Sequence, residues 1–145
     1  KTFLDIGKSL EALETLGVPV LSYRQDRFPG YYVRESEFPA IRVDSGEEAV
    51  GIALRHWEIG RSGGLLLGVP IPEEAALSGQ RIEAIISRVL ADAGGKGDGK
   101  HVTPRIIRAI EQETGGATAA ANRALIVAAA EVAADAAIAL ANFGQ

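Results

Sequence analysis

The sequence predicts a helix-rich α/β fold, layered α/β/α around a mixed sheet and ending in a long alanine-rich helix. Apolar residues switch repeatedly between helical spacing and short strand-like runs, which is the pattern of such folds. Of the 145 residues, 47% are hydrophobic, enough to build the core of one domain. We find no internal repeat and no clear domain boundary, so residues 1–145 are predicted to belong to a single domain.

The beginning of the chain is predicted to run from a helix into a strand and then into an ordered loop. A helical stripe of apolar residues ends at Gly17, and residues 18–21 have the pattern of a short buried strand. Residues 25–40 combine prolines and a glycine with four aromatic side chains, which predicts a loop whose rings pack and can also line a pocket. The helical stripe consists of Ile6, Leu10 and Leu13, with Asp5 as the expected cap.

A second helix and a second strand are predicted in the middle of the chain. Ser45 and Glu48 form a capping-box signature, and apolar residues then recur at helical spacing up to Gly60. Residues 64–68 form a compact apolar run of strand type. The two prolines within residues 70–72 prevent this run from continuing as a central strand, so a turn is expected at the strand end.

The last third of the chain is predicted to be helical. One amphipathic helix is expected over about residues 79–93, and the next has Thr103 as N-cap and Pro104 in its first turn. Residues 115–116, both glycine, separate that helix from the alanine-rich one, which starts near Thr118. The stripe expected to be buried on this last helix, against a sheet or a neighbouring subunit, consists of Leu125, Ala129, Val132, Ala136 and Leu140.

Composition excludes several classes of function. The chain has no cysteine, which excludes disulfides and thiolate chemistry, and two histidines alone cannot build a conventional zinc site. A net charge of -4 spread along the sequence gives no electrostatic footprint for nucleic acid or an anionic membrane. Charged residues at 123, 131 and 135 interrupt the apolar segment 117–143, so no membrane span is expected, and no signal peptide is recognised. These features fit a cytoplasmic location.

A glycine-rich run at residues 94–101 nearly spells a phosphate-binding P-loop. His101 stands where that motif requires Ser or Thr, and the run follows a predicted helix rather than a strand. A flexible connection is the favoured interpretation. A mobile flap whose Lys96 and Lys100 approach an anion remains the alternative.

Other chemistry-bearing residues have simple structural interpretations. His56 and His101 have no spacing that demands metal ligation, so each is expected to be hydrogen-bonded or solvated. Glu131 and Asp135 share a helical face, and like charges at that spacing usually face water. The acidic pair at residues 73–74 is expected to start a helix, where negative charge interacts favourably with the helix dipole.

Three stretches resemble, in this order, the second half of pseudouridine-5'-phosphate glycosidases, a family also described as indigoidine synthase A-like. They are Leu-Glu-Thr-Leu-Gly-Val-Pro-Val at residues 13–20, Val-Pro-Ile-Pro-Glu-Glu at residues 69–74, and Thr-Gly-Gly at residues 114–116, which Ala-Asn at 121–122 follows. The opening run Lys-Thr-Phe-Leu-Asp-Ile, residues 1–6, then falls on the lysine segment of the family. The resemblance covers essentially the whole chain.

The resemblance implies an activity and two catalytic residues. The family cleaves the carbon-carbon glycosidic bond of pseudouridine 5'-phosphate to uracil and ribose 5-phosphate, through a lysine that attaches to the anomeric carbon of the ribose. Lys1 falls on that nucleophile, and Asn122 matches the asparagine that would orient the base or the sugar. From the residues alone, a structural hydrogen bond is about as plausible a role for Asn122, and a terminal lysine is ordinarily solvated.

The remaining machinery implied by the resemblance belongs to the half that would precede this chain. That half supplies the acid-base glutamate, the phosphate-handling lysine and the aspartate that binds divalent manganese. The sequence holds no methionine and begins with lysine, so we expect a fragment or processed product that is inactive alone. Its expected partners are the N-terminal half of the same enzyme and, in a homotrimer, further copies.

Two departures from the family pattern bear on the site. Val69 stands where members generally have asparagine, and residues 128–130 are all alanine where members often have a pair of asparagines. Substrate positioning is therefore expected to differ. Two other functions stay open: a structural or assembly half without chemistry, and a different Schiff-base lyase that acts on sugar phosphates.

Overall fold

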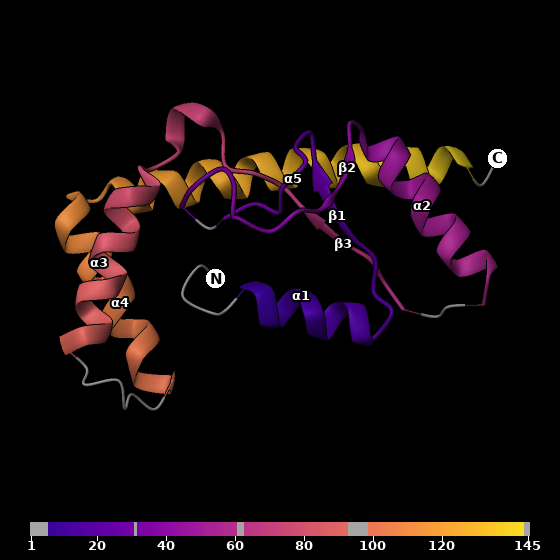
Figure 1. Ribbon diagram of the computed structural model, residues 1–145. Coiled ribbons are helices and arrows are strands. Elements are labelled where there is room, and N and C mark those ends of the chain that lie inside the picture. Colours follow the sequence, from indigo (N-terminus) through magenta and orange to yellow (C-terminus); the bar gives the residue numbers. More distant parts are fainter. Residues whose placement is uncertain (1–5, 31, 61–62, 93–98, 144–145) are drawn as a thin grey trace.

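The described residues form a small sheet and five helices, as a computed structural model shows (Figure 1). The structure describes residues 6–30, 32–60, 63–92 and 99–143. In chain order the elements are α1 (Ile6–Thr15), β1 (Val20–Tyr23), β2 (Ile41–Val43), α2 (Gly46–Glu58), β3 (Leu66–Gly68), the 3-10 turn η1 (Glu73–Ala75), α3 (Gly79–Asp92), α4 (Gly99–Thr114) and α5 (Ala117–Phe143). The predicted helix-rich α/β class with a long C-terminal helix is confirmed.

The sheet has three described strands in the order β2-β1-β3, and both pairings are parallel. Leu21 of β1 pairs with Ile41 on one side and with Leu67 on the other. The mixed sheet expected from the sequence is therefore wrong for the described strands. The physical reason is the connections: residues 24–40 and then α2 each return the chain to the same end of the sheet before the next strand begins.

The local helix signals of the first half are confirmed with small shifts. The Ser45 hydroxyl accepts a hydrogen bond from the Glu48 amide at 3.1 Å, and Glu48 accepts from the Asp44 amide at 2.6 Å, which caps α2. Gly17 ends the turn after α1 with a φ of 68°, a conformation that favours glycine. The first strand starts two residues later than predicted, and the short strand β2 was not predicted.

The long helix α5 is held tightly against the start of α2. A Cβ atom on Gly46 would lie 2.7 Å from Ala136 N and 3.0 Å from Ala136 Cα, so only glycine allows this approach. Figure 1 shows α5 running along one side of the strands with α2 crossing near its C-terminal end, while α1 lies on the other side. At this crossing, α2 and α5 are packed directly against each other.

Apolar packing among the described residues falls into two clusters. One cluster joins the sheet to α2 through Leu21, Val43 and Ala49. The other joins α3, α4 and the start of α5 to the loops of the sheet. Its buried members are Tyr32, Ile71, Ile82, Ile85, Ile110 and Ala121.

Two expectations for the C-terminal helices need correction. Helix α4 begins at Gly99, so Thr103 and Pro104 lie within it rather than at its N-cap and first turn. Pro104 has no N–H to donate, so α4 runs through this position with one hydrogen bond missing. On α5 the buried residues are Thr118, Ala121 and Val132, whereas Leu140 of the predicted stripe is 41% exposed.

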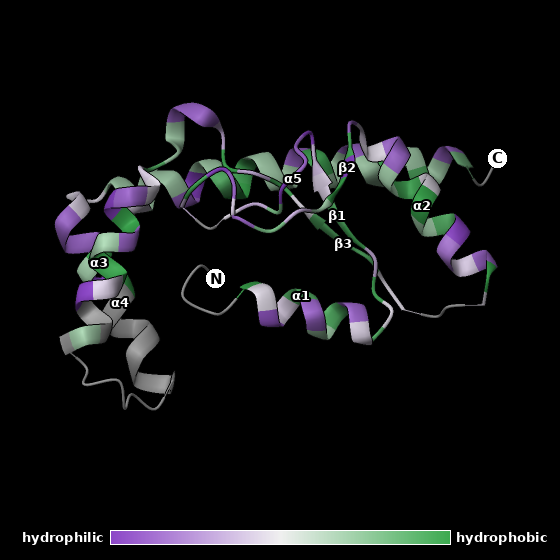
Figure 2. Cartoon of the chain, viewed as in Figure 1, coloured by the Kyte–Doolittle hydropathy of each residue, from purple (hydrophilic) through white to green (hydrophobic). Residues whose placement is uncertain are grey.

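Helix α5 is apolar along most of its length (Figure 2), and it carries several of the exposed large apolar side chains. Its large exposed side chains are Ile126, Val127, Ile138, Leu140 and Phe143. By length and composition α5 also qualifies as a membrane-crossing helix, with a mean hydropathy of 2.0 over an 18-residue window of which 6% is buried in the described structure. We expected the charges at residues 123, 131 and 135 to exclude a membrane span. By length and composition they do not. The same composition also suits a helix buried between protein layers.

Replacement of Gly46 by alanine is expected to destabilise the fold. The added Cβ meets backbone atoms of Ala136, which cannot rotate away, so the two helices must move apart. The expected loss is ~1–3 kcal/mol in free energy of unfolding, measured by urea denaturation. Gly51→Ala is the matched control, because a Cβ at this position of α2 meets nothing within 4 Å and should add ~0.5–1 kcal/mol. Equal effects of the two changes would contradict the close approach.

Candidate functional site

The carboxyl ends of the parallel strands form one edge of the sheet, where ligands usually bind in open α/β folds. The long loop of residues 24–40 follows β1 at this edge, and residues 69–78 follow β3. Hydrogen bonds from two buried side chains hold the start of this loop. Ser22 is fully buried and donates from Oγ to the Arg27 carbonyl at 2.8 Å, and buried Gln25 donates from Nε2 to the same carbonyl at 2.8 Å.

The two segments interlock at several points. Arg34 donates from Nη1 to the Ile71 carbonyl at 3.2 Å, and the Leu77 amide donates to the Tyr32 carbonyl at 2.8 Å. At the strand end, a Cβ on Gly68 would lie 2.7 Å from the Pro29 ring. The loop after β1 and the proline-rich turn after β3 therefore form one rigid edge.

Asn122 lies in the second turn of α5 and is half-buried, with an interaction partner in the described structure. At 100° per residue, Asn122 shares a flank of α5 with Ile126 and Ala129. The opposite flank carries Ala124 and Glu131 and faces Pro72 across a shallow groove of about 450 Å³. The proline-rich turn therefore lies next to α5, but Asn122 is not among the residues that line the groove between them.

Lys1 lies outside the described residues, so its predicted proximity to Asn122 stays a prediction. The first described residue of the opening segment, Ile6, lines a cavity of about 430 Å³ between the loop after β1 and α3. Phe38 lines the same cavity, as expected for an aromatic of that loop, whereas Tyr32 is buried in the core. Asn122 is not among the residues that line this cavity.

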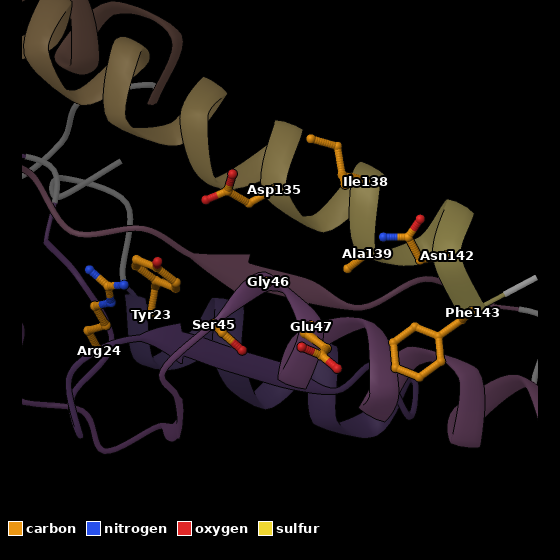
Figure 3. A pocket seen from close by; sticks show the side chains of 10 residues that line it. All are labelled: Tyr23, Arg24, Ser45, Gly46, Glu47, Asp135, Ile138, Ala139, Asn142 and Phe143. Carbon is orange, nitrogen blue, oxygen red and sulfur yellow. The ribbon is translucent and has the colours of Figure 1, made fainter.

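A larger cavity of about 490 Å³ lies between the start of α2 and the end of α5 (Figure 3). Asp135 and Phe143 of α5 border it on one side, and Arg24 and Glu47 border it on the other. From the rise of a helix, Asp135 lies roughly 20 Å along α5 from Asn122. This cavity is therefore separate from the region of Asn122, and no sequence motif pointed to it.

Charged groups in the described structure are arranged for solvation and local pairing. No cluster of three or more His, Cys, Asp or Glu side chains that could hold a metal occurs within the described ranges. Arg42 hydrogen-bonds the carboxylate of Asp44 at 2.8 Å, which raises the pKa of the guanidinium. Glu131 and Asp135 are exposed, as expected for a like-charged pair, and the P-loop-like residues 94–98 lie outside the described structure.

Two residues at the carboxyl edge were missed by sequence reasoning. Gln25 is 5% exposed, and its Oε1 has no hydrogen-bond partner among the described residues. Arg34 donates a hydrogen bond to the carbonyl of Ile71, which lies 37 positions further along the sequence. Both sit in a loop whose composition signals only turns and aromatics, so no local pattern could have identified their partners.

The fold and this edge place the chain in a known family. Residues 1–139 match the family model of indigoidine synthase A-like proteins, and the chain belongs to this family. The resemblance recognised in the sequence is thereby confirmed.

Curated relatives carry a specific name. A pseudouridine-5'-phosphate glycosidase of Nocardioides sp. is 44% identical over 128 residues, which are 87% of this chain and 42% of that protein. One from Cupriavidus pinatubonensis is 43% identical and covers 98% of this chain and 46% of that protein. The chain therefore spans about half the length of the curated relatives it matches.

Solved structures share the fold. A prealnumycin C-glycosynthase, crystallised with ribulose 5-phosphate, superposes with a TM-score of 0.87 at 34% identity, covering all of this chain and 49% of that one. An indigoidine synthase A-like protein of Thermotoga maritima gives a TM-score of 0.74 at 30% identity, covering 96% of this chain and 46% of that one. The fold described above is thus the fold of one half of these proteins.

Replacement of Gly68 by alanine is expected to loosen the carboxyl edge. The added Cβ would meet the Pro29 ring at 2.7 Å and the Phe28 ring at 3.0 Å, and a proline ring has little freedom to move aside. We expect a loss of ~1–3 kcal/mol in free energy of unfolding, measured by thermal or urea denaturation. Gly64→Ala, which meets nothing within 4 Å, should change stability by less than ~0.5 kcal/mol. A neutral Gly68→Ala would show that the loop is not packed on the strand end.

Proposed function

We propose that this chain is the C-terminal half of an enzyme that cleaves the carbon-carbon glycosidic bond of pseudouridine 5'-phosphate. The observation that supports it most directly is 43% identity across 98% of the chain to a curated glycosidase of that name. Because the chain spans 46% of that relative, the activity is proposed for an assembly that also contains the other half. The net reaction consumes water and releases uracil and ribose 5-phosphate.

The proposed chemistry runs through a Schiff base on Lys1. Attack of a neutral amine on the anomeric carbon displaces the ring oxygen and opens the ribose, and the nitrogen lone pair then forms an iminium on that carbon as the carbon-carbon bond to the base breaks. Uracil leaves after protonation of its carbon, and water then releases ribose 5-phosphate and regenerates the amine. The solved C-glycosynthase was crystallised with a pentose phosphate, which supports a sugar phosphate as the ligand class of this fold.

Asn122 is proposed to orient the base or the sugar through its amide. Asn122 is half-buried in the second turn of α5, next to the buried Ala121. The backbone from which its side chain extends is therefore held in place by packing. Val69 and the alanines at residues 128–130 replace asparagines that the family resemblance leads us to expect. The positions around Asn122 thus offer fewer amide groups to a substrate.

A divalent metal, expected to be manganese, is assigned to the other half. The described residues offer no set of three carboxylate or imidazole ligands, so they do not fit a metal centre by themselves. No chemical step of the proposal is routed through the metal. A homotrimeric assembly and a cytoplasmic location are carried over from the sequence resemblance and composition as parts of the same proposal.

A second candidate is an assembly half without chemistry. It is favoured by the alanines at residues 128–130, which remove polar groups where the family resemblance expects amides. A different Schiff-base lyase acting on sugar phosphates is the third candidate. Both are separated from the main proposal by the product released from pseudouridine 5'-phosphate.

Lys1→Ala is expected to abolish turnover. The assay uses this chain co-expressed with the N-terminal half of the Cupriavidus pinatubonensis relative, and it measures uracil released from pseudouridine 5'-phosphate. Loss of a covalent nucleophile should lower kcat by at least about a thousandfold. Borohydride should trap ribose phosphate on the Lys1 peptide in the parent assembly and not in the variant.

The matched control is Lys8→Ala, an exposed lysine of α1 in the same part of the chain, which should keep the parent rate. Uracil release by Lys1→Ala at the parent rate would refute the nucleophile. A parent assembly that binds its partner half but releases no uracil would favour the assembly-half candidate.

Helix α5 is proposed to provide the contact surface for the other half. The solved relatives are about twice as long as this chain and share its fold, so a comparable mass of protein must pack against it. Ile126, which is 60% exposed, and Ile138, which is 62% exposed, place apolar surface on both flanks of α5. Burial of such flanks fits a helix placed between two protein layers.

Ile126→Glu is expected to weaken association with the partner half by at least about tenfold, because a carboxylate would be transferred from water into an apolar contact. The measurement is the dissociation constant of the two halves in a pull-down titration or by calorimetry. Ile126→Leu keeps the apolar surface and should bind within about threefold of the parent. Equal affinities for the parent and for Ile126→Glu would place the contact elsewhere.

A further inference from the structure

The proline-rich turn after β3 has few backbone N–H groups that could form hydrogen bonds. Pro70 and Pro72 have no N–H, so this turn lacks two of the donors that would anchor an ordinary segment. Ile71 between them is fully buried, and a buried carbonyl requires a hydrogen-bond donor. Its donor comes from another segment of the chain.

Arg34 supplies this donor. Its Nη1 donates to the Ile71 carbonyl at 3.2 Å, and the Arg34 side chain is partly buried, so this hydrogen bond is shielded from competition with water. Gln25 in turn fixes the backbone of Arg34, since its Nε2 donates to the Arg34 carbonyl at 3.0 Å as well as to the Arg27 carbonyl. Gln25 is 5% exposed and anchored at the end of β1. Hydrogen bonds through Gln25 and Arg34 thus link the end of the central strand β1 to the turn.

The turn leads on to the region of Asn122. Ile71 belongs to the same buried cluster as Ala121, the residue that precedes Asn122 on α5. The 3-10 turn η1, which begins directly after Pro72, also contacts α5. A shift of Ile71 would therefore be transmitted to the second turn of α5, because a close-packed cluster moves as a unit.

We infer that Arg34 is a positioning residue, which holds the proline-rich turn and through Ile71 fixes where Asn122 lies. The inference rests on the proposed function in so far as Asn122 serves the substrate there. Arg34 itself touches no reacting atom in this scheme.

Arg34→Met tests the inference, because methionine keeps the apolar stem of arginine and removes its donors. In the assembly used for Lys1, we expect kcat/KM for pseudouridine 5'-phosphate to fall about tenfold, the usual worth of a hydrogen bond from a charged group. Arg34→Lys retains a charged N–H donor group and should recover most of the rate. The matched control is Arg27→Met: this arginine of the same loop donates to the Glu37 carbonyl at 2.7 Å, so its bond stays within the loop.

A second readout does not depend on activity. The chain contains two asparagines, Asn122 and Asn142, so asparagine-selective ¹⁵N labelling gives two side-chain amide signals. Arg34→Met should shift the Asn122 signal and leave that of Asn142, at the far end of α5, in place. Arg27→Met should shift neither.

The outcomes are distinguishable. An Asn122 signal that moves no more in Arg34→Met than in Arg27→Met overturns the inference, whether or not the assembly is active. Movement of that signal in an assembly that releases no uracil upholds the positioning role and refutes the proposed function. A lower rate of Arg34→Met that Arg34→Lys does not recover, with an unmoved Asn122 signal, also overturns the inference.

Discussion

The close crossing of α2 and α5 is the constraint on which the rest of this structure depends. Gly46 lets the start of α2 touch the backbone of α5 at Ala136, and any side chain there would separate the helices. Because α2 also packs on the sheet through Ala49, this contact fixes α5 relative to the strands. The crossing therefore sets the direction of α5 relative to the strands.

A rigid helix fixed at one end carries its other end into a defined place. Helix α5 extends 27 residues, and it also meets the turn after β3 and the helix α4. The cluster that contains Ile71 and Ala121 closes this second end. The carboxyl edge of the sheet and the start of α5 are therefore held in register by two separate packing centres, one at each end of the helix.

The exposed apolar surface of α5 and the half-length match to the relatives have a common explanation. A chain that represents one half of a larger fold must leave apolar surface where the other half packs, and such surface is costly to expose to water. Ile126 and Ile138 mark this surface at two places along the helix, roughly 120° apart around its axis.

The sequence by itself determined the helix-rich α/β class, the cap of α2 and the family. Ser45 with Glu48 predicted the start of α2, Gly17 predicted the end of α1, and the ordered motifs around residues 69–74 predicted the family, because each signal is local and is set by hydrogen bonding or backbone freedom within a few residues. The tertiary structure alone decided the parallel pairing of the strands, the exposed face of α5 and the bond from Arg34 to Ile71. Each of these depends on segments tens of residues apart in sequence, and no local propensity records which distant partner a strand edge, a helix flank or a guanidinium will meet.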